Sequence, residues 1–184
     1  MIRPATLDDV PAIEALIAYS VHALQAADYS PEQRAGALGT VFGVDRRMIE
    51  DATYFVVEDE EEEQIVACGG WSRRRTPFGG DLSPKKDDSF LDPASDAARV
   101  RAFFVHPEYA RRGLATMLLN ACEAAAHAAG FSRAELTSTL TGVALYQARG
   151  FEPKERFELP LRNGATLPVV RMEKTWSRPS GAGA

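Results

Sequence analysis

The chain alternates between two hydrophobic rhythms, one typical of helices and one typical of strands. Behind the polar residues 6–9, apolar side chains return every three or four positions, at Val10, Ile13, Leu16, Ile17 and Val21. This spacing, with capping residues in front of it, predicts an amphipathic helix. Ser30 followed by Pro31 predicts a second helix. That helix runs towards Leu38, and an irregular or helical stretch continues to Glu50.

Runs rich in β-branched and aromatic residues predict strands. They occupy residues 2–4, 53–58, 64–72, 98–105, 133–138, 151–159 and 167–176. The acidic residues 59–63 predict a solvated hairpin turn between the second and third runs. Asn163-Gly164 is a strong hairpin signal between the last two runs. Both β pairs are therefore expected to be antiparallel.

Two further helices are predicted in the second half of the chain. In residues 114–129 the apolar positions share one face, and Gly130 ends the helix. A shorter helix at 141–149 is stopped by Gly150. Turn signals fill residues 73–97, a length more typical of functional or mobile loops than of simple connections.

The resulting order, β-α-α-β-β-β-α-β-α-β-β, predicts an α/β fold, with helices on the faces of a mixed sheet. The 184 residues are enough for one domain with a substantial core, which we assign to residues 1–176. Residues 177–184 are small and polar, and we expect a disordered tail.

Composition narrows the class of protein further. The chain is 45% hydrophobic and 26% charged, which is typical of a globular protein, and its net charge of -5 favours neither nucleic acid nor an anionic membrane as partner. No apolar stretch is long enough for a membrane span, and the start of the chain lacks an apolar signal core. Cys68 and Cys122 lie in a predicted strand and on a predicted apolar helix face, so we expect two core thiols, no metal and a cytoplasmic protein.

The most informative segment is residues 110–116, where a strand is followed by a turn and the start of a helix. The first amides of a helix lack internal partners and carry partial positive charge, so they can bind a diphosphate. Gly113 lets the backbone approach closely, and Arg111 and Arg112 add charge. An exposed basic turn is the alternative, but the apolar strand in front and the amphipathic helix behind favour a phosphate site.

This segment resembles the cofactor-binding motif of the GCN5-related N-acetyltransferase (GNAT) superfamily, [Q/R]-x-x-G-x-[G/A]. Gly113 and Ala115 match the motif, and Ala110 stands where the family usually has Gln or Arg. Residues 144–151 are similar to the family's late helix motif around a Tyr, which is Tyr146 here. Thr139 stands where an Asn often precedes that Tyr by seven positions. Residues 2–9 also resemble the family's usual start.

The resemblance implies an acetyl-CoA-dependent N-acetyltransferase that acts by direct attack of a primary amine. It implies that acetyl-CoA is held by Phe104, Val105, Arg111, Arg112, Gly113, Leu114, Ala115 and Thr116. Pantetheine would insert where residues 102–105 splay from 135–138, and backbone N–H groups near Phe104 and Val105 would polarise the thioester carbonyl. Tyr146 would protonate the leaving thiolate, as against a Tyr packed in the core with its hydroxyl satisfied elsewhere.

Several questions stay open at this stage. The acceptor is a small molecule or a peptide, and a homodimer is a candidate state because dimers are common among similar proteins. No general base is evident: His106 and Glu108 lie near the phosphate loop, and a water relay would leave no signature. Residues 73–75, three arginines, either select an anionic acceptor or are simply exposed. The aromatic candidates for the acceptor pocket, which the core also accommodates, are Tyr29, Trp71 and Phe78.

Two rival functions belong to other classes. One is a non-catalytic acyl-CoA-binding or regulatory module on the same fold, since fold alone does not fix function. The other is a general nucleotide-phosphate binder, which the missing Walker pattern disfavours. Tyr146 favours the enzyme over the non-catalytic module.

Overall fold

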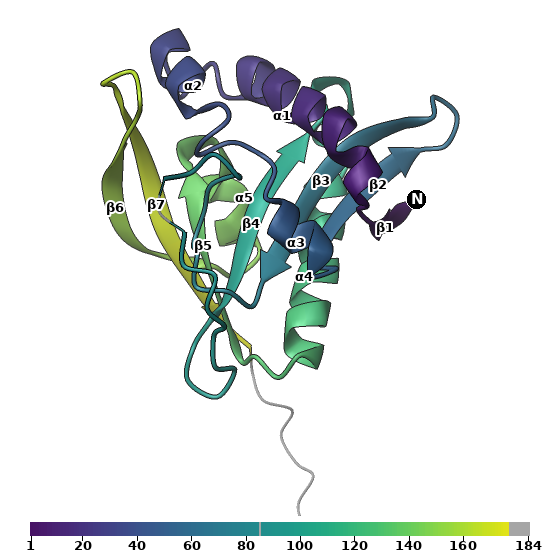
Figure 1. Cartoon of the computed structure of the whole chain (residues 1–184), viewed down its shortest axis with the longest axis vertical. Helices are drawn as coiled ribbons and strands as arrows, with labels where there is room; N and C mark the ends of the chain where they lie inside the picture. Colours follow the sequence, from purple (N-terminus) through teal and green to yellow (C-terminus); the bar gives the residue numbers. More distant parts are fainter. Residues whose placement is uncertain (85, 177–184) are drawn as a thin grey trace, which may run out of the picture.

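The computed structural model of the chain describes residues 1–84 and 86–176. Its centre is a seven-stranded sheet in the order β1-β2-β3-β4-β5-β7-β6 (Figure 1). The strands are β1 (Ile2–Pro4), β2 (Tyr54–Asp59), β3 (Gln64–Ser72), β4 (Ala98–Val105), β5 (Arg133–Thr139), β6 (Glu152–Pro160) and β7 (Thr166–Thr175). Neighbouring strands are antiparallel except for β4 and β5, which are parallel.

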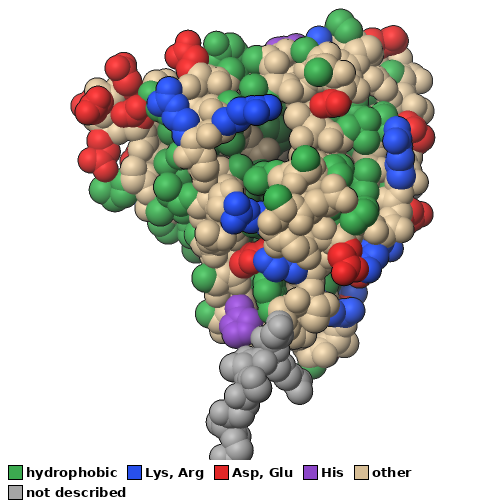
Figure 2. Space-filling model, turned by 180° about the vertical axis from the view of Figure 1, so that it is seen from behind, with side chains coloured by type: hydrophobic (Ala, Val, Ile, Leu, Met, Phe, Trp, Pro, Cys, Tyr) green, Lys and Arg blue, Asp and Glu red, His purple; other side chains and the backbone are tan. Residues whose placement is uncertain are grey.

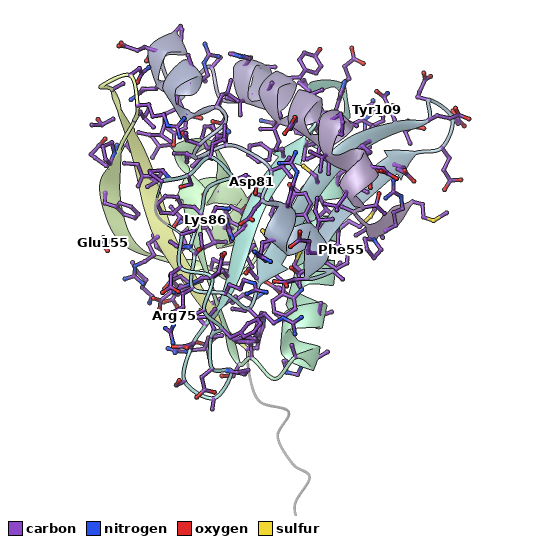
Figure 3. The ribbon with its side chains drawn as sticks, viewed as in Figure 1. Phe55, Arg75, Asp81, Lys86, Tyr109 and Glu155 are labelled. Carbon is purple, nitrogen blue, oxygen red and sulfur yellow. The ribbon has the colours of Figure 1, made fainter. Side chains whose placement is uncertain are left out.

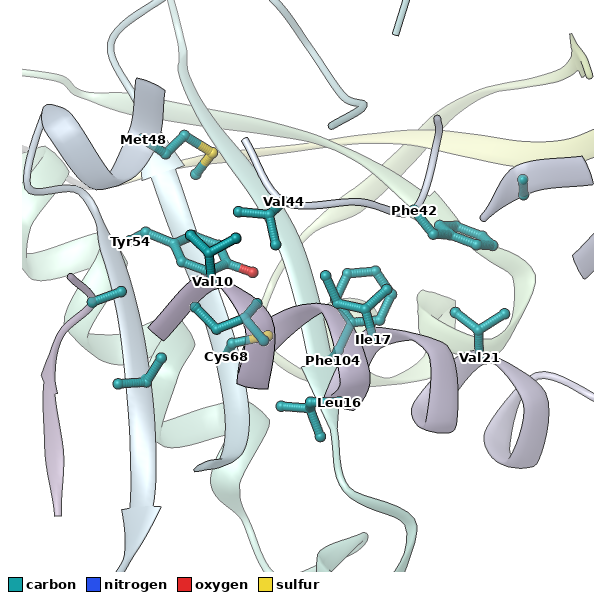
Figure 4. Packing of buried hydrophobic residues seen from close by; sticks show 14 of the residues in the cluster. Val10, Leu16, Ile17, Val21, Phe42, Val44, Met48, Tyr54, Cys68 and Phe104 are labelled. Carbon is teal, nitrogen blue, oxygen red and sulfur yellow. The ribbon is translucent and has the colours of Figure 1, made fainter. Parts of the chain in front are cut away.

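Helices cover both faces of the sheet. They are α1 (Val10–Leu24), α2 (Pro31–Ala37), α3 (Arg46–Glu50), α4 (Leu114–Ala128) and α5 (Val143–Ala148), with single 3-10 turns at Leu7–Asp9, Pro107–Tyr109 and Leu140–Gly142. On one face, Ile17 of α1 and Met48 of α3 pack with Phe104 of β4 (Figure 4). On the other, Leu119 of α4 and Tyr146 of α5 pack in a separate core cluster. Successive side chains of β4 point to opposite faces of the sheet, so this strand contributes residues to both hydrophobic clusters.

The predicted α/β fold and the order of its elements are confirmed. The stretch up to Glu50, left as irregular or helical, contains α3, which Asp45 caps by accepting a hydrogen bond from the Arg47 N–H (3.2 Å). The helix predicted at 141–149 is shorter, because a 3-10 turn precedes α5. Cys68 and Cys122 are buried free thiols, as expected, and burial raises the pKa of Cys68 to about 12. The predicted tail, residues 177–184, lies outside the described residues.

Strand β4 carries the irregularity that shapes the site. Its register with β3 shifts between Cys68 and Gly70, so β4 has one extra residue, and Ala102 has φ of 59°. Positive φ at a non-glycine residue is a strained conformation typical of such bulges near functional sites. Opposite the bulge, a Cβ on Gly69 would come within 2.8 Å of the Phe103 ring. Glycine at position 69 is therefore needed for the bulge to pack.

The long connection between β3 and β4 is a folded segment. It pairs with itself through Leu91 N–H to Arg73 O (2.8 Å) and Arg75 N–H to Ser89 O (3.0 Å). Its middle is hydrogen-bonded to the chain before α3, through Gly80 N–H to Thr40 O (2.7 Å) and Asp81 N–H to Val44 O (2.8 Å). These bonds place residues 77–79 over the sheet face that carries α1 and α3.

Candidate active site

A gap opens in the sheet where β4 and β5 stop pairing. The two strands are paired at Ala98, Arg99 and Val100, and the pairing ends opposite Leu136. Beyond this point the second half of β4 keeps only β3 as a neighbour. The splaying predicted from the family resemblance is thus present, and it frees backbone groups of β4 on one edge.

Strand alternation decides which amides of β4 face the gap. The His106 N–H is bonded to Val66 O on β3 (2.8 Å), so the Phe104 N–H, two residues earlier, also points towards β3. The Phe103 and Val105 N–H groups point the opposite way. The Val105 N–H is donated to Ser20 Oγ of α1 at 3.4 Å, a long bond that a better acceptor can replace. Of the predicted pair, Val105 has the amide directed into the gap, and the Phe104 side chain lies in the core beside Phe42 (Figure 4).

The gap continues into a cavity of about 520 Å³. Its walls come from both sheet faces and from the start of α4. They include all the predicted cofactor residues except Arg112, together with Tyr146, Phe78, Arg101, Phe42, Gln25 and Ser20. On the face shown in Figure 2, a hollow is bordered by side chains of Lys or Arg.

The phosphate loop has the backbone form that the sequence predicts. Arg111 (φ 62°) and Gly113 (φ 83°) are both left-handed, and α4 begins without any side-chain cap. The first helical bond is from Met117 N–H to Gly113 O (2.9 Å), so the amides of residues 114–116 have no partner within the helix. A Cβ on Gly113 would meet nothing within 4 Å. An uncapped start of a 15-residue helix, bordering a cavity, is suited to bind an anion.

The two arginines of this loop have different surroundings. Arg111 lines the cavity. Arg112 does not, and its guanidinium lies over the Tyr109 ring, 4.7 Å from the centroid. Arg111 is therefore the better placed of the two to add charge at a bound diphosphate.

Tyr146 lies at the wall of the cavity from α5. Its ring packs edge-on against Phe103 (6.3 Å between centroids) and Phe151 (5.9 Å). Its hydroxyl has no hydrogen-bond partner within residues 1–84 and 86–176, so the alternative of a core Tyr with a satisfied hydroxyl has no support in the geometry. Burial raises the pKa of Tyr146 above its ordinary value, which keeps the phenol protonated.

No carboxylate or imidazole lines the cavity among the described residues. His106 caps the 3-10 turn after β4, since its Nδ1 accepts from the Glu108 N–H at 3.3 Å. This is the capping role that its position in the sequence favours. His127 packs edge-on against Trp176 at 6.1 Å, away from the gap. A general base is therefore not supplied by any His, Asp or Glu wall residue in the part of the chain that the structure describes.

Residues 73–75 lie away from the phosphate loop, as expected: Figure 3 places Arg75 at the opposite end of the molecule from Tyr109. Arg74 holds Asp51 with two bonds (2.6 and 2.8 Å) and lies 4.4 Å from the Phe90 ring centroid. None of the three arginines lines the cavity. Of the three aromatic candidates for the acceptor pocket, Phe78 lines it, whereas Trp71 and Tyr29 are core residues.

Sequence reasoning missed Ser20, Gln25 and Arg101 as cavity residues. Ser20 interrupts the apolar face of α1 between Ile17 and Val21, which is the one local signal that could have identified it. Arg101 reads as an ordinary polar strand residue, although its side chain is only 3% exposed.

A gap between parallel strands, with an anion-binding helix start at one end, is an arrangement suited to an extended phosphate-bearing ligand. The chain belongs to the Acetyltransferase (GNAT) family, whose sequence pattern matches residues 18–151, and it is therefore an acyltransferase. None of the curated protein sequences is significantly similar to it.

Solved structures have the same fold. The GCN5-related N-acetyltransferase of Rhodopseudomonas palustris has a TM-score of 0.69 at 20% identity, over 95% of this chain and 94% of that one. A PaiA N-acetyltransferase of Thermoplasma acidophilum, in complex with coenzyme A, has a TM-score of 0.63 at 13% identity, over 96% and 98%. The ribosomal-protein-alanine N-acetyltransferase of Brucella melitensis has 0.61 at 18% identity, over 95% and 99%.

The structure also bears on the expectations about membrane spans and metal sites. None of the helices in residues 1–84 and 86–176 combines the length and the apolar character that a membrane crossing requires. Within the same residues, no group of three or more His, Cys, Asp or Glu side chains is arranged to hold a metal ion.

Proposed function

We propose that residues 1–176 form a single N-acetyltransferase domain that transfers an acetyl group from acetyl-CoA to the primary amine of a small molecule or peptide. The observation that carries the proposal is the continuity of the cavity, which extends from Gly113 at the helix start, past the free edge of β4, to Tyr146. The coenzyme A complex of the Thermoplasma protein, which has the same fold, supports acetyl-CoA as the co-substrate.

The residues of this chain fit such a co-substrate. Arg111 and the amides of residues 113–116 would bind the diphosphate, because charged and backbone donors converge there without competing acceptors. The Phe103 and Val105 amides, directed into the gap, would hold pantetheine as an added strand and stabilise the oxyanion. Phe104 would contribute packing, since its amide is directed to β3.

Bound acetyl-CoA supplies a thioester, and the acceptor nitrogen forms a bond to the acetyl carbon as the C–S bond breaks and the departing sulfur takes a proton. Tyr146 is the proposed donor of that proton. Tyr146 lines the cavity, and its hydroxyl lacks another partner within the described residues and stays neutral because its pKa is raised. Since no acidic or imidazole side chain lines the cavity among the described residues, water is the proposed acceptor of the amine's proton, before or during attack.

Acetylation assays with a panel of primary amines would test the proposal, comparing native protein with Tyr146→Phe. We expect thiol release and an acetylated amine from native protein, and a large loss of kcat in the variant. Coenzyme A binding with no turnover of any amine would favour the non-catalytic module instead. Two unpaired cysteines are consistent with a cytoplasmic site of action, and a homodimer is the oligomeric state to test by sedimentation.

A further inference from the structure

The two ends of the cavity are the only places where charged side chains line it, within the residues that the structure describes. Arg111 lies at the phosphate end, and Arg101 lies at the other end, close to the loop of residues 77–79. No Asp, Glu, Lys or His lines the wall between them. A cavity charged in this way repels an acceptor with extra cationic groups and attracts an acceptor that carries an anion.

The guanidinium of Arg101 has an N–H donor without an acceptor among the described residues. Its Nη2 donates to Gly79 O at 2.7 Å and lies 2.9 Å from Asp45 Oδ2. Its Nε is buried and has no partner among residues 1–84 and 86–176. A buried guanidinium N–H without an acceptor is unfavourable, and burial lowers the pKa of Arg101. A further oxygen acceptor with negative charge would relieve both effects.

The charges around Arg101 leave room for an anion. Asp45 also faces Lys86 Nζ at 3.1 Å, so one carboxylate serves two cations. Lys86 lies 3.7 Å from Asp81, which in turn pairs with Arg46 at 2.5 Å (Asp81 and Lys86 are labelled in Figure 3). Arg46, at the exposed outer end, lies 4.0 Å from Glu14. Arg101, at the buried inner end of this network, therefore shares its carboxylate partner Asp45 with Lys86.

We propose that Arg101 binds a carboxylate of the acceptor, so that the substrate class is an amine that also carries a carboxylate, such as a free α-amino acid. The inference rests on the proposed function, because it concerns the acceptor side of the same cavity. Arg101 and Phe103 stand on either side of the bulge residue Ala102, and both line the cavity together with Val105. A carboxylate at Arg101 therefore leaves a nearby amine within reach of the acyl position beside the Phe103 and Val105 amides.

The competing explanation is that Arg101 only anchors Gly79 and Asp45 to the sheet. Acceptor pairs separate the two explanations: free amino acids are compared with their primary amides, which keep the amine and lose the charge. For native protein we expect kcat/KM, calculated per neutral amine because the amine of the amides is the less basic, to be about 10- to 100-fold higher for the acids, the range of a hydrogen bond to a charged group. Equal kcat/KM values per neutral amine for both series would overturn the carboxylate inference and leave acetyl transfer intact.

Two variants test whether the preference for acids over amides depends on Arg101. Arg101→Lys keeps the charge but loses the fork of donors, and Arg101→Met combined with Asp45→Asn removes both buried charges so that neither is left unpaired. We expect the acid-to-amide ratio to fall towards one in both variants. Because the ratio is calculated per neutral amine, the different amine pKa values of the two series do not enter it. A lower melting temperature with an unchanged ratio would show that Arg101 is structural.

Arg99→Gln is the matched control. Arg99 is another arginine of β4, and its Nε also has no partner among the described residues, but it is more exposed than Arg101, pairs with Glu135 and lines a separate charged pocket. Its ratio should equal that of native protein, and a fall as large as in the Arg101 variants would refute a specific role for Arg101.

A binding experiment tests the carboxylate site without requiring turnover. Coenzyme A-saturated protein is titrated with the same acids and amides by calorimetry. If no amine is acetylated, the proposed function fails. Tighter binding of acids than of amides, lost in Arg101→Lys, would still support the carboxylate site, and equal binding would overturn it.

Discussion

Replacing Gly113 by Ala tests whether the phosphate loop works through close backbone approach. Gly113 has φ of 83°, where an L-residue costs roughly 1–2 kcal/mol. A Cβ there meets no atom within 4 Å, so the only cost in free energy of unfolding is this backbone strain. At about 2–4 °C per kcal/mol, the melting temperature should fall by a few degrees. Coenzyme A should bind at least about 10-fold more weakly, because the methyl group separates phosphate oxygens from charge-assisted donors.

Gly164→Ala provides a matched control. Gly164 has φ of 87°, a Cβ there also meets nothing within 4 Å, and it lies in the β6–β7 turn rather than in the cavity wall. Calorimetric unfolding and coenzyme A titration of both variants separate strain from binding. Both should lose similar stability, and only Gly113→Ala should lose affinity. If Gly113→Ala binds coenzyme A as native protein does, the diphosphate does not approach this loop as described.

Three further predictions concern the chemistry and the arginines. Tyr146→Phe should lower kcat by about 10²–10⁴-fold with little change in KM for acetyl-CoA, measured by thiol release, because its hydroxyl has no other partner in the described residues. The same loss in coenzyme A affinity would indicate a binding role instead. With native protein, kcat/KM should rise with pH towards the amine's own pKa of about 10. The value of kcat/KM should not fall through ionisation of Tyr146, whose raised pKa keeps it protonated; a plateau beginning near pH 6–7 would reveal a base other than the described residues of the cavity wall. Arg74→Gln should lower stability by about 1–3 kcal/mol, through loss of its two bonds to Asp51, without altering the acceptor preference. Because Arg74 lowers the pKa of Asp51, this stabilisation is present above pH ~4 and lost in acid; an altered acceptor preference would return Arg74 to the binding site.

The backbone of residues 110–116 could be predicted from the sequence because its determinants are local. Gly113 supplies the left-handed residue, and the apolar period behind it fixes where α4 begins. The hairpin at Asn163-Gly164 is likewise local, and Gly164 has the expected positive φ. In each case a few adjacent residues determine the backbone.

The bulge of β4 could not be predicted in the same way. Its left-handed residue is Ala102, which intrinsically disfavours φ of 59°, and only the pairing of β3 with β4 imposes that conformation. The direction of the Phe104 and Val105 amides depends on this register. Sequence reasoning therefore placed the two residues near the thioester without distinguishing their roles.

The acceptor side depends on contacts between segments distant in the chain. Asp45 and Arg101 meet only because residues 73–97 fold over the sheet and dock beside Val44. The arginine cluster at residues 73–75 attracted attention in the sequence because its charges are adjacent. In the structure, Arg101 lines the cavity, at the end that we propose for the acceptor, and none of residues 73–75 does.

The most direct test of the account is to incubate native protein with acetyl-CoA and a primary amine acceptor, and to quantify free coenzyme A and acetylated amine together. The account predicts that both appear in equal amounts, that the yield depends on the protein, and that Tyr146→Phe suppresses both. Tight binding of coenzyme A with no acetylated amine from any acceptor in the panel would contradict it.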